Sequence, residues 1–159
     1  MKPETLFLKI AVFLMAVPVL ALCIFVIPGL TVGVGEFIPE FSFWVQVASI
    51  GIYLSAILYF LVLYQSLKLL RYIDKNKAFS KLSVTALKYI KYYAATISML
   101  FLLAMPLVYI VAEKDDAPGL IIIGMVIALA PMVVAVFAAV LQKLLKNAME
   151  IKTENDLTV

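Results

Sequence analysis

The sequence predicts an all-α integral membrane protein with four transmembrane helices, and its composition, charge-free stretches and charge distribution support this. The 159-residue chain is 65% hydrophobic and 14% charged, whereas soluble domains are about 45–50% apolar and about 25% charged. Four stretches without a charged residue cover 10–35, 41–67, 92–112 and 117–142. Each is at least as long as the roughly 20 residues that a helix needs to cross a bilayer. At this length we expect one membrane domain, 1–159, without a separate soluble module.

The basic residues are distributed unevenly. Twelve of the thirteen Lys and Arg residues lie at the N-terminus, within 68–91 or after residue 142. The two remaining loops, 35–40 and 113–116, carry five acids and one lysine. Because Lys and Arg concentrate on the cytoplasmic side, we expect an up-down-up-down bundle with an N-in/C-in topology. The chain is expected to cross the membrane several times with both termini in the cytoplasm.

The four spans follow from these boundaries. The first continues well beyond the roughly 7–15 apolar residues of a signal peptide, so we interpret it as a retained helix. Trp44 and Tyr64 bracket the second at the headgroup levels that amphipathic rings prefer, and Tyr109 marks one end of the third. The expected spans are 8–33, 42–74, 81–112 and 117–150.

Prolines and small residues indicate how the spans pack. Proline inside a helix removes one backbone hydrogen bond, so Pro18, Pro106 and Pro131 are expected either to shape the bundle or to open a cavity. Small residues four apart allow close helix contact, and we interpret them as packing within one chain, with a homo-oligomer seam as the alternative. These pairs are Gly29 and Gly33, Gly51 and Ser55, Gly124 and Ala128, and Ala135 and Ala139.

The spans offer little chemistry. They hold no ionisable Asp, Glu, Lys or Arg side chain at mid-membrane, and the chain has no histidine and one cysteine. A serine nucleophile needs a nearby base, and a Cys/His metal site needs more ligands. Ser55 is expected to bond back to its own helix. We therefore predict no catalytic, cofactor or metal site and a non-enzymatic protein, while a small channel or carrier for an uncharged or amphipathic solute stays open.

The segment 68–91 predicts a basic helical hairpin against the inner leaflet. Asn76 and Lys77 interrupt the helical pattern, and Ser80 resembles a helix N-cap, with Phe79 and Val84 at hydrophobic-staple spacing. Asp74 is expected to pair with Arg71 or Lys77. Basic residues near a membrane attract anionic lipid, and the same surface could dock a cytoplasmic protein. The candidate contact residues are Lys68, Arg71, Lys75, Lys77, Phe79, Lys81, Lys88 and Lys91.

The C-terminal segment 153–159 is acidic. Glu154 and Asp156 follow the last lysine, so their charge is complementary to that of the hairpin. We expect this tail either to dock on the hairpin of its own chain, with a partner able to displace it, or to end as a frayed, solvated terminus.

Three short motifs carry a family resemblance. They are the loop Ile73–Ser80, the turn Ala112–Gly119 and the closing Glu154–Val159. In this order and spacing they resemble the bacterial four-helix membrane proteins of domain-of-unknown-function family 2975, over nearly the whole chain. The resemblance implies a location in the bacterial inner membrane and no established activity. It implies that the gene often neighbours one for a small helix-turn-helix regulator, which suggests a protein partner.

The sequence thus favours a membrane-anchored regulatory partner of a small cytoplasmic helix-turn-helix transcription factor. Its own direct binding to nucleic acid is not expected. The alternatives are the small channel or carrier, and a membrane stress or peptide-immunity protein.

Overall fold

The structure is a computed structural model that describes residues 3–158, and over this range the regular elements are all helices. The first span is made of α1 (Pro3–Ala21), a π-helical turn η1 (Leu22–Val26) and α2 (Ile27–Phe37). A short 3-10 helix η2 (Pro39–Phe41) leads into α3 (Ser42–Asp74), which is followed by α4 (Lys81–Lys114) and α5 (Gly119–Thr158). The four spans are long and apolar enough to cross a membrane, as the sequence predicts.

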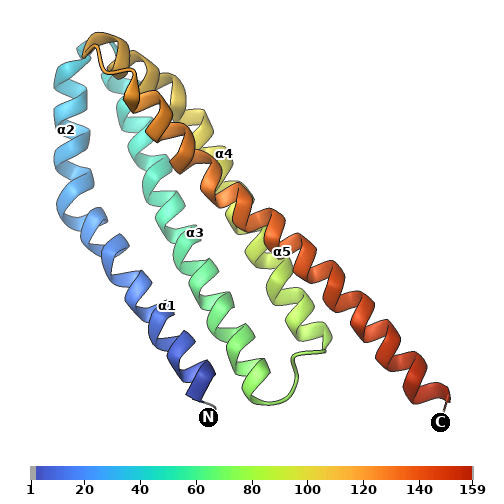
Figure 1. Ribbon diagram of the computed structural model, residues 1–159. Helices are drawn as coiled ribbons and strands as arrows, with labels where there is room; N and C mark the ends of the chain where they lie inside the picture. Colours follow the sequence, from blue (N-terminus) through green and yellow to red (C-terminus); the bar gives the residue numbers. More distant parts are fainter. Residues whose placement is uncertain (1–2, 159) are drawn as a thin grey trace.

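The spans lie in a row rather than around a closed centre (Figure 1). The packing between α4 and α5 is the most extensive, and α4 also packs along α3. The first span contacts α3 and makes at most marginal contact with α4 and α5. The short connections make neighbouring spans antiparallel, as expected for an up-down-up-down order. One side of the row is therefore open between the first span and α5.

The two ends of the molecule differ in charge. The start of α1, the α3–α4 turn and the end of α5 form the basic end, where Lys9 contacts Asp74 and Lys91 contacts Gln142. The α2–α3 junction and the α4–α5 turn form the acidic end, where Lys114 contacts Phe37. The predicted topology places the basic end in the cytoplasm.

Small side chains build the α4–α5 interface. Alanines make up six of the thirteen buried apolar residues among the described side chains, and on α5 these are Ala128, Ala135 and Ala138. This spacing of seven and three residues keeps one stripe facing α4. The fully buried Ser98 donates a hydrogen bond to the carbonyl oxygen of Ala128 at 2.6 Å. Both helix backbones therefore approach closely.

The glycines do not all pack within the chain, which corrects part of the sequence interpretation. A Cβ built on Gly124 would lie 3.1 Å from the sulfur of Met105, so this glycine is covered by α4. A Cβ on Gly29, Gly33 or Gly51 would meet nothing within 4 Å. The Gly29–Gly33 pair thus makes no close helix contact in the monomer.

The bend of the first span lies at η1 (Figure 1). There the amide of Ile27 bonds to the carbonyl of Leu22, five residues earlier. Pro28 follows directly and has no amide hydrogen to donate, which favours a widened turn before it. Pro18, in contrast, lies inside the continuous helix α1, as Pro106 and Pro131 do in α4 and α5.

The helices α3 and α4 end with the same backbone geometry. Asn76 and Asp116 have positive φ values of 59° and 52°. The next amide, that of Lys77 or Ala117, bonds to the carbonyl five residues earlier, at 2.7 and 2.8 Å. This Schellman geometry satisfies the last carbonyls of a helix, and Asn tolerates the left-handed residue in it.

Asn76 therefore offers a local test of the turn. Asn76→Gly should leave the free energy of unfolding within about 0.5 kcal/mol of the wild type, whereas Asn76→Val should lower it by about 1–2 kcal/mol, because a β-branched residue is strained at positive φ. Lys75→Val is the control, since Lys75 has a φ of −89°. Unfolding titrations in mixed micelles would measure the differences; equal losses for the two valine variants would argue against backbone strain.

Candidate functional site

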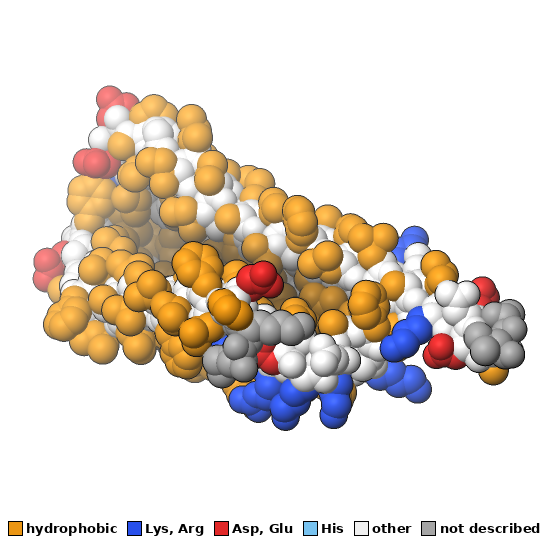
Figure 2. Space-filling model, turned by 60° about the horizontal axis from the view of Figure 1, so that its bottom comes forward, with side chains coloured by type: hydrophobic (Ala, Val, Ile, Leu, Met, Phe, Trp, Pro, Cys, Tyr) orange, Lys and Arg blue, Asp and Glu red, His pale blue; other side chains and the backbone are white. Residues whose placement is uncertain are grey.

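The predicted basic hairpin lies at the basic end, where α3 and α4 are joined by a turn over residues 75–80. Its charged side chains gather on one surface (Figure 2). Phe79 is 57% exposed among them. The other exposed candidate residues are Arg71, Lys75, Lys77, Lys81 and Lys88, while Lys68 and Lys91 are half-buried. The structure thus brings an accessible aromatic ring and five accessible cations together.

Asp74 ties this hairpin to the first span. Its carboxylate accepts a hydrogen bond from the Thr5 hydroxyl and forms an ion pair with Lys9 at 2.6 Å. The two side chains of the ion pair are 18% and 13% exposed. The expectation that Asp74 pairs with Arg71 or Lys77 was wrong, because its position in the last turn of α3 faces α1. We call the three residues Thr5, Lys9 and Asp74 the clamp.

The two half-buried lysines are positioned by neighbours. The Lys68 ammonium lies 5.3 Å from the ring centroid of Tyr64, one turn earlier on α3. Lys91 lies 4.7 Å from the centroid of Tyr92 and donates a hydrogen bond to the Gln142 side chain on α5 at 3.2 Å. Cation–π contacts of this kind hold a charge near a ring, so these lysines are less available to a partner than those of the turn.

Ser80 precedes α4 in the predicted N-cap position, but its side chain does not cap the helix. Its hydroxyl donates back to the carbonyl of Lys77 at 2.5 Å, and Ser83 donates to the same oxygen at 3.2 Å. The carbonyl of Ser80 accepts from the amide of Val84. The hydroxyls thus hold the turn rather than the first amides of the helix.

The acidic tail is the end of α5, which remains helical through Thr158. Figure 1 shows this end leaning away from the rest of the row. Glu154 lines a groove with Lys81, at the point where α5 passes the start of α4. Asp156 lies further along the helix and is exposed. The tail therefore brings one of its two carboxylates beside the hairpin while both remain accessible.

Two tyrosines that the sequence analysis left without a role fasten the first span to α3. Tyr53 donates to the carbonyl of Cys23 at 3.2 Å, and Tyr59 to that of Met15 at 2.9 Å. Cys23 lies in the π turn, five residues before Pro28, which cannot donate to it. The acceptors are backbone carbonyls, which no residue type marks, so these two contacts could not be predicted from the sequence.

The chain matches, over residues 1–159, the family model described as protein of unknown function (DUF2975). It belongs to this family. It is also 57% identical over 156 residues to the uncharacterized membrane protein YoaS of Bacillus subtilis (strain 168), with 98% of both chains covered. No solved structure matches the chain. The resemblance stated from the three motifs is therefore confirmed, and this member of the DUF2975 family is a membrane protein of unknown function.

Proposed function

We propose that the protein is a non-catalytic membrane anchor for a small helix-turn-helix regulator, which docks on the hairpin in the cytoplasm. The observation that carries the proposal is the exposure of Phe79 among five cations at the basic end. Aromatic residues and Arg are enriched at protein interfaces, and a basic surface steers an acidic partner toward it. Anionic lipid headgroups compete for the same cations.

The clamp supports this role because it couples the hairpin to the bilayer. It joins α3 at Asp74 to α1 at Lys9 across the edge of the row. A movement of the first span within the membrane would displace the last turn of α3, and with it the turn that carries Phe79. The docking surface then responds to the packing of the first span, which gives a route from membrane state to release of the regulator.

Co-purification tests the docking site. The full-length chain would be co-expressed with a candidate small helix-turn-helix protein and extracted in mild detergent. We expect the triple variant Lys75→Gln, Lys77→Gln and Lys81→Gln to reduce recovery of the regulator at least tenfold, since it removes three adjacent attractive charges. The matched control removes three charges from the same end, at Lys143, Lys146 and Lys152.

Two outcomes would contradict the proposal. One is recovery of the regulator by the hairpin variant at the wild-type level. The other is an equal loss with both triple variants, which would indicate general attraction to a positively charged end rather than a defined surface. Phe79→Ala separates packing from charge: we expect it to weaken the complex without changing the charge of the protein.

A further inference from the structure

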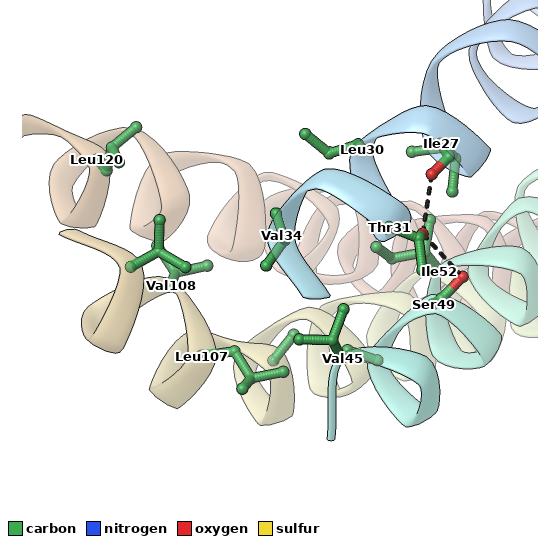
Figure 3. Close-up of a pocket in the computed structure, with 13 residues that line it drawn as sticks. Ile27, Leu30, Thr31, Val34, Val45, Ser49, Ile52, Leu107, Val108 and Leu120 are labelled. Atoms are coloured by element: carbon green, nitrogen blue, oxygen red, sulfur yellow. Dashed lines mark hydrogen bonds between the residues drawn. The ribbon is translucent and has the colours of Figure 1, made fainter. Parts of the chain in front are cut away.

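The acidic end contains an apolar cavity that the proposed docking function does not use. It has a volume of about 250 Å³ and lies between α2, α3 and α4, with Leu120 of α5 at one side. Figure 3 shows Leu30 and Val34 of α2 lying across it from Leu107 and Val108 of α4. Drug-sized pockets hold about 300–1,000 Å³, so this cavity has room for part of one aliphatic chain.

The wall of the cavity presents almost no hydrogen-bonding capacity. Thr31 and Ser49 are its two polar residues. The Thr31 hydroxyl donates to the carbonyl of Ile27 at 2.8 Å and lies 3.2 Å from the Ser49 hydroxyl (Figure 3). A buried polar group without a partner is costly. The part of a ligand that enters the cavity must therefore be aliphatic.

The end of the molecule beyond the cavity is acidic, and we call its carboxylates the rim. Glu36 follows the lining residue Val34 by two positions, and Glu113 follows Val111 by two. Their backbone therefore lies about 3 Å further toward the acidic end than the lining residues but about 200° around the helix from them, so the carboxylates lie beyond the cavity and not in its wall. Lys114 points its ammonium at the carbonyl and the ring of Phe37. The acids at this end are all exposed: Glu36, Glu40, Glu113, Asp115 and Asp116. Figure 2 shows acidic side chains at the end of the hollowed apolar face away from the basic cluster.

We propose that this cavity binds a cationic amphiphile with a single aliphatic chain. The chain lies among Leu30, Val34 and Leu107, and the cationic headgroup lies at the carboxylates of the rim. Charge complementarity favours a cationic headgroup. This end carries five carboxylates and one lysine, which disfavours an anionic lipid. The open side between the first span and α5 lets the chain enter from the bilayer. This inference is independent of the hairpin and of any regulator.

Binding can be measured with dodecyltrimethylammonium and the full-length protein in nanodiscs of zwitterionic phosphatidylcholine. Equilibrium dialysis with labelled amphiphile, corrected with empty nanodiscs, separates a site from partitioning into lipid. We expect saturable binding of one dodecyltrimethylammonium per chain. Dodecanol should bind at least tenfold more weakly, and dodecyl sulfate should show no saturable component. Absence of saturable binding, or equal binding of the three probes, would overturn the proposal.

Variants locate the site. Val34→Phe fills the cavity and should abolish saturable binding, whereas Val32→Phe adds the same volume to the same helix at a side chain that is 61% exposed and should bind as the wild type does. Circular dichroism would verify that both remain helical. Binding by Val34→Phe at the wild-type level would place the amphiphile elsewhere and refute the assignment.

The rim is tested separately from the cavity. Glu36→Gln, Glu40→Gln and Glu113→Gln together should weaken binding of dodecyltrimethylammonium about tenfold, because exposed charge pairs contribute modestly and add up. The control is Glu150→Gln with Glu154→Gln at the basic end, which should leave the affinity unchanged. Equal affinities for the rim variant and the wild type would reject the role of the carboxylates.

Discussion

Asp74→Asn is expected to lower the free energy of unfolding by about 2–4 kcal/mol and to release the N-terminal part of α1 from α3. Removing one partner of a buried ion pair leaves the other charge uncompensated, which costs about 3–5 kcal/mol. The Lys9 and Asp74 side chains retain 18% and 13% exposure, so we expect about 1 kcal/mol less than for a fully buried pair. The first span buries little else: Thr5 is the buried residue of α1.

A double-mutant cycle isolates the clamp from other effects of the substitutions. Lys9→Met alone should also destabilise, but Lys9→Met in the Asp74→Asn background should cost little, because the charge that lost its partner is removed. Unfolding by SDS titration would give the stabilities. Spin labels on α1 and α3 would report whether the two helices separate at the basic end. Additive losses in the cycle would show that the two residues act independently and would contradict the clamp.

The fold was predictable because the bilayer imposes a length and a polarity on each span. The second span was expected at 42–74, and α3 runs from Ser42 to Asp74. The charges that ended the spans also predicted the two ends of the molecule. The open row was not predictable from the sequence. Lipid tails are as apolar as leucine, so a helix face that contacts lipid and one that contacts another helix can carry the same apolar residues.

The partner of Asp74 shows where local reasoning stops. Arg71 and Lys77 lie three residues away in sequence, and i to i+3 pairs are common on helices. Lys9 lies 65 residues away, and the contact depends on how α1 and α3 are aligned. That alignment is set by the Tyr53 and Tyr59 hydrogen bonds to backbone carbonyls, which carry no sequence signature on the accepting side. The exposure of Arg71 and Lys88, by contrast, agrees with helical periodicity, whereas Lys77 and Phe79 lie in the turn between the helices.

The tail was harder to predict for a related reason. Its acids suggested a separate segment, yet α5 continues through them to Thr158. Thr153 donates to the carbonyl of Met149 at 2.9 Å, within the helix. Glu and Lys are good helix formers, so a change of charge sign did not mark a change of structure. A helix boundary requires a cap or a breaking residue, and this segment has neither glycine nor proline.

Ala128→Leu is the substitution expected to disturb the helix packing most. Ala128 is 1% exposed, and its carbonyl accepts the 2.6 Å hydrogen bond from the fully buried Ser98. A leucine side chain has no room there without moving α5 away from α4, which would also stretch that hydrogen bond. Overpacking costs about 1–3 kcal/mol, and loss of the buried bond adds about 1 kcal/mol, so we expect a loss of about 3 kcal/mol.

Ala130→Leu is the matched control, because Ala130 lies two residues further along α5 and is exposed. It adds the same side chain on the lipid-facing side and should change stability by less than about 0.5 kcal/mol. SDS titration of both variants measures the difference, and Ser98→Ala in the Ala128→Leu background tests the hydrogen bond, since it should cost almost nothing once the helices have separated. Equal stability of Ala128→Leu and Ala130→Leu would mean that α4 and α5 do not rely on close backbone contact, and the row of helices would then need another explanation for its most extensive interface.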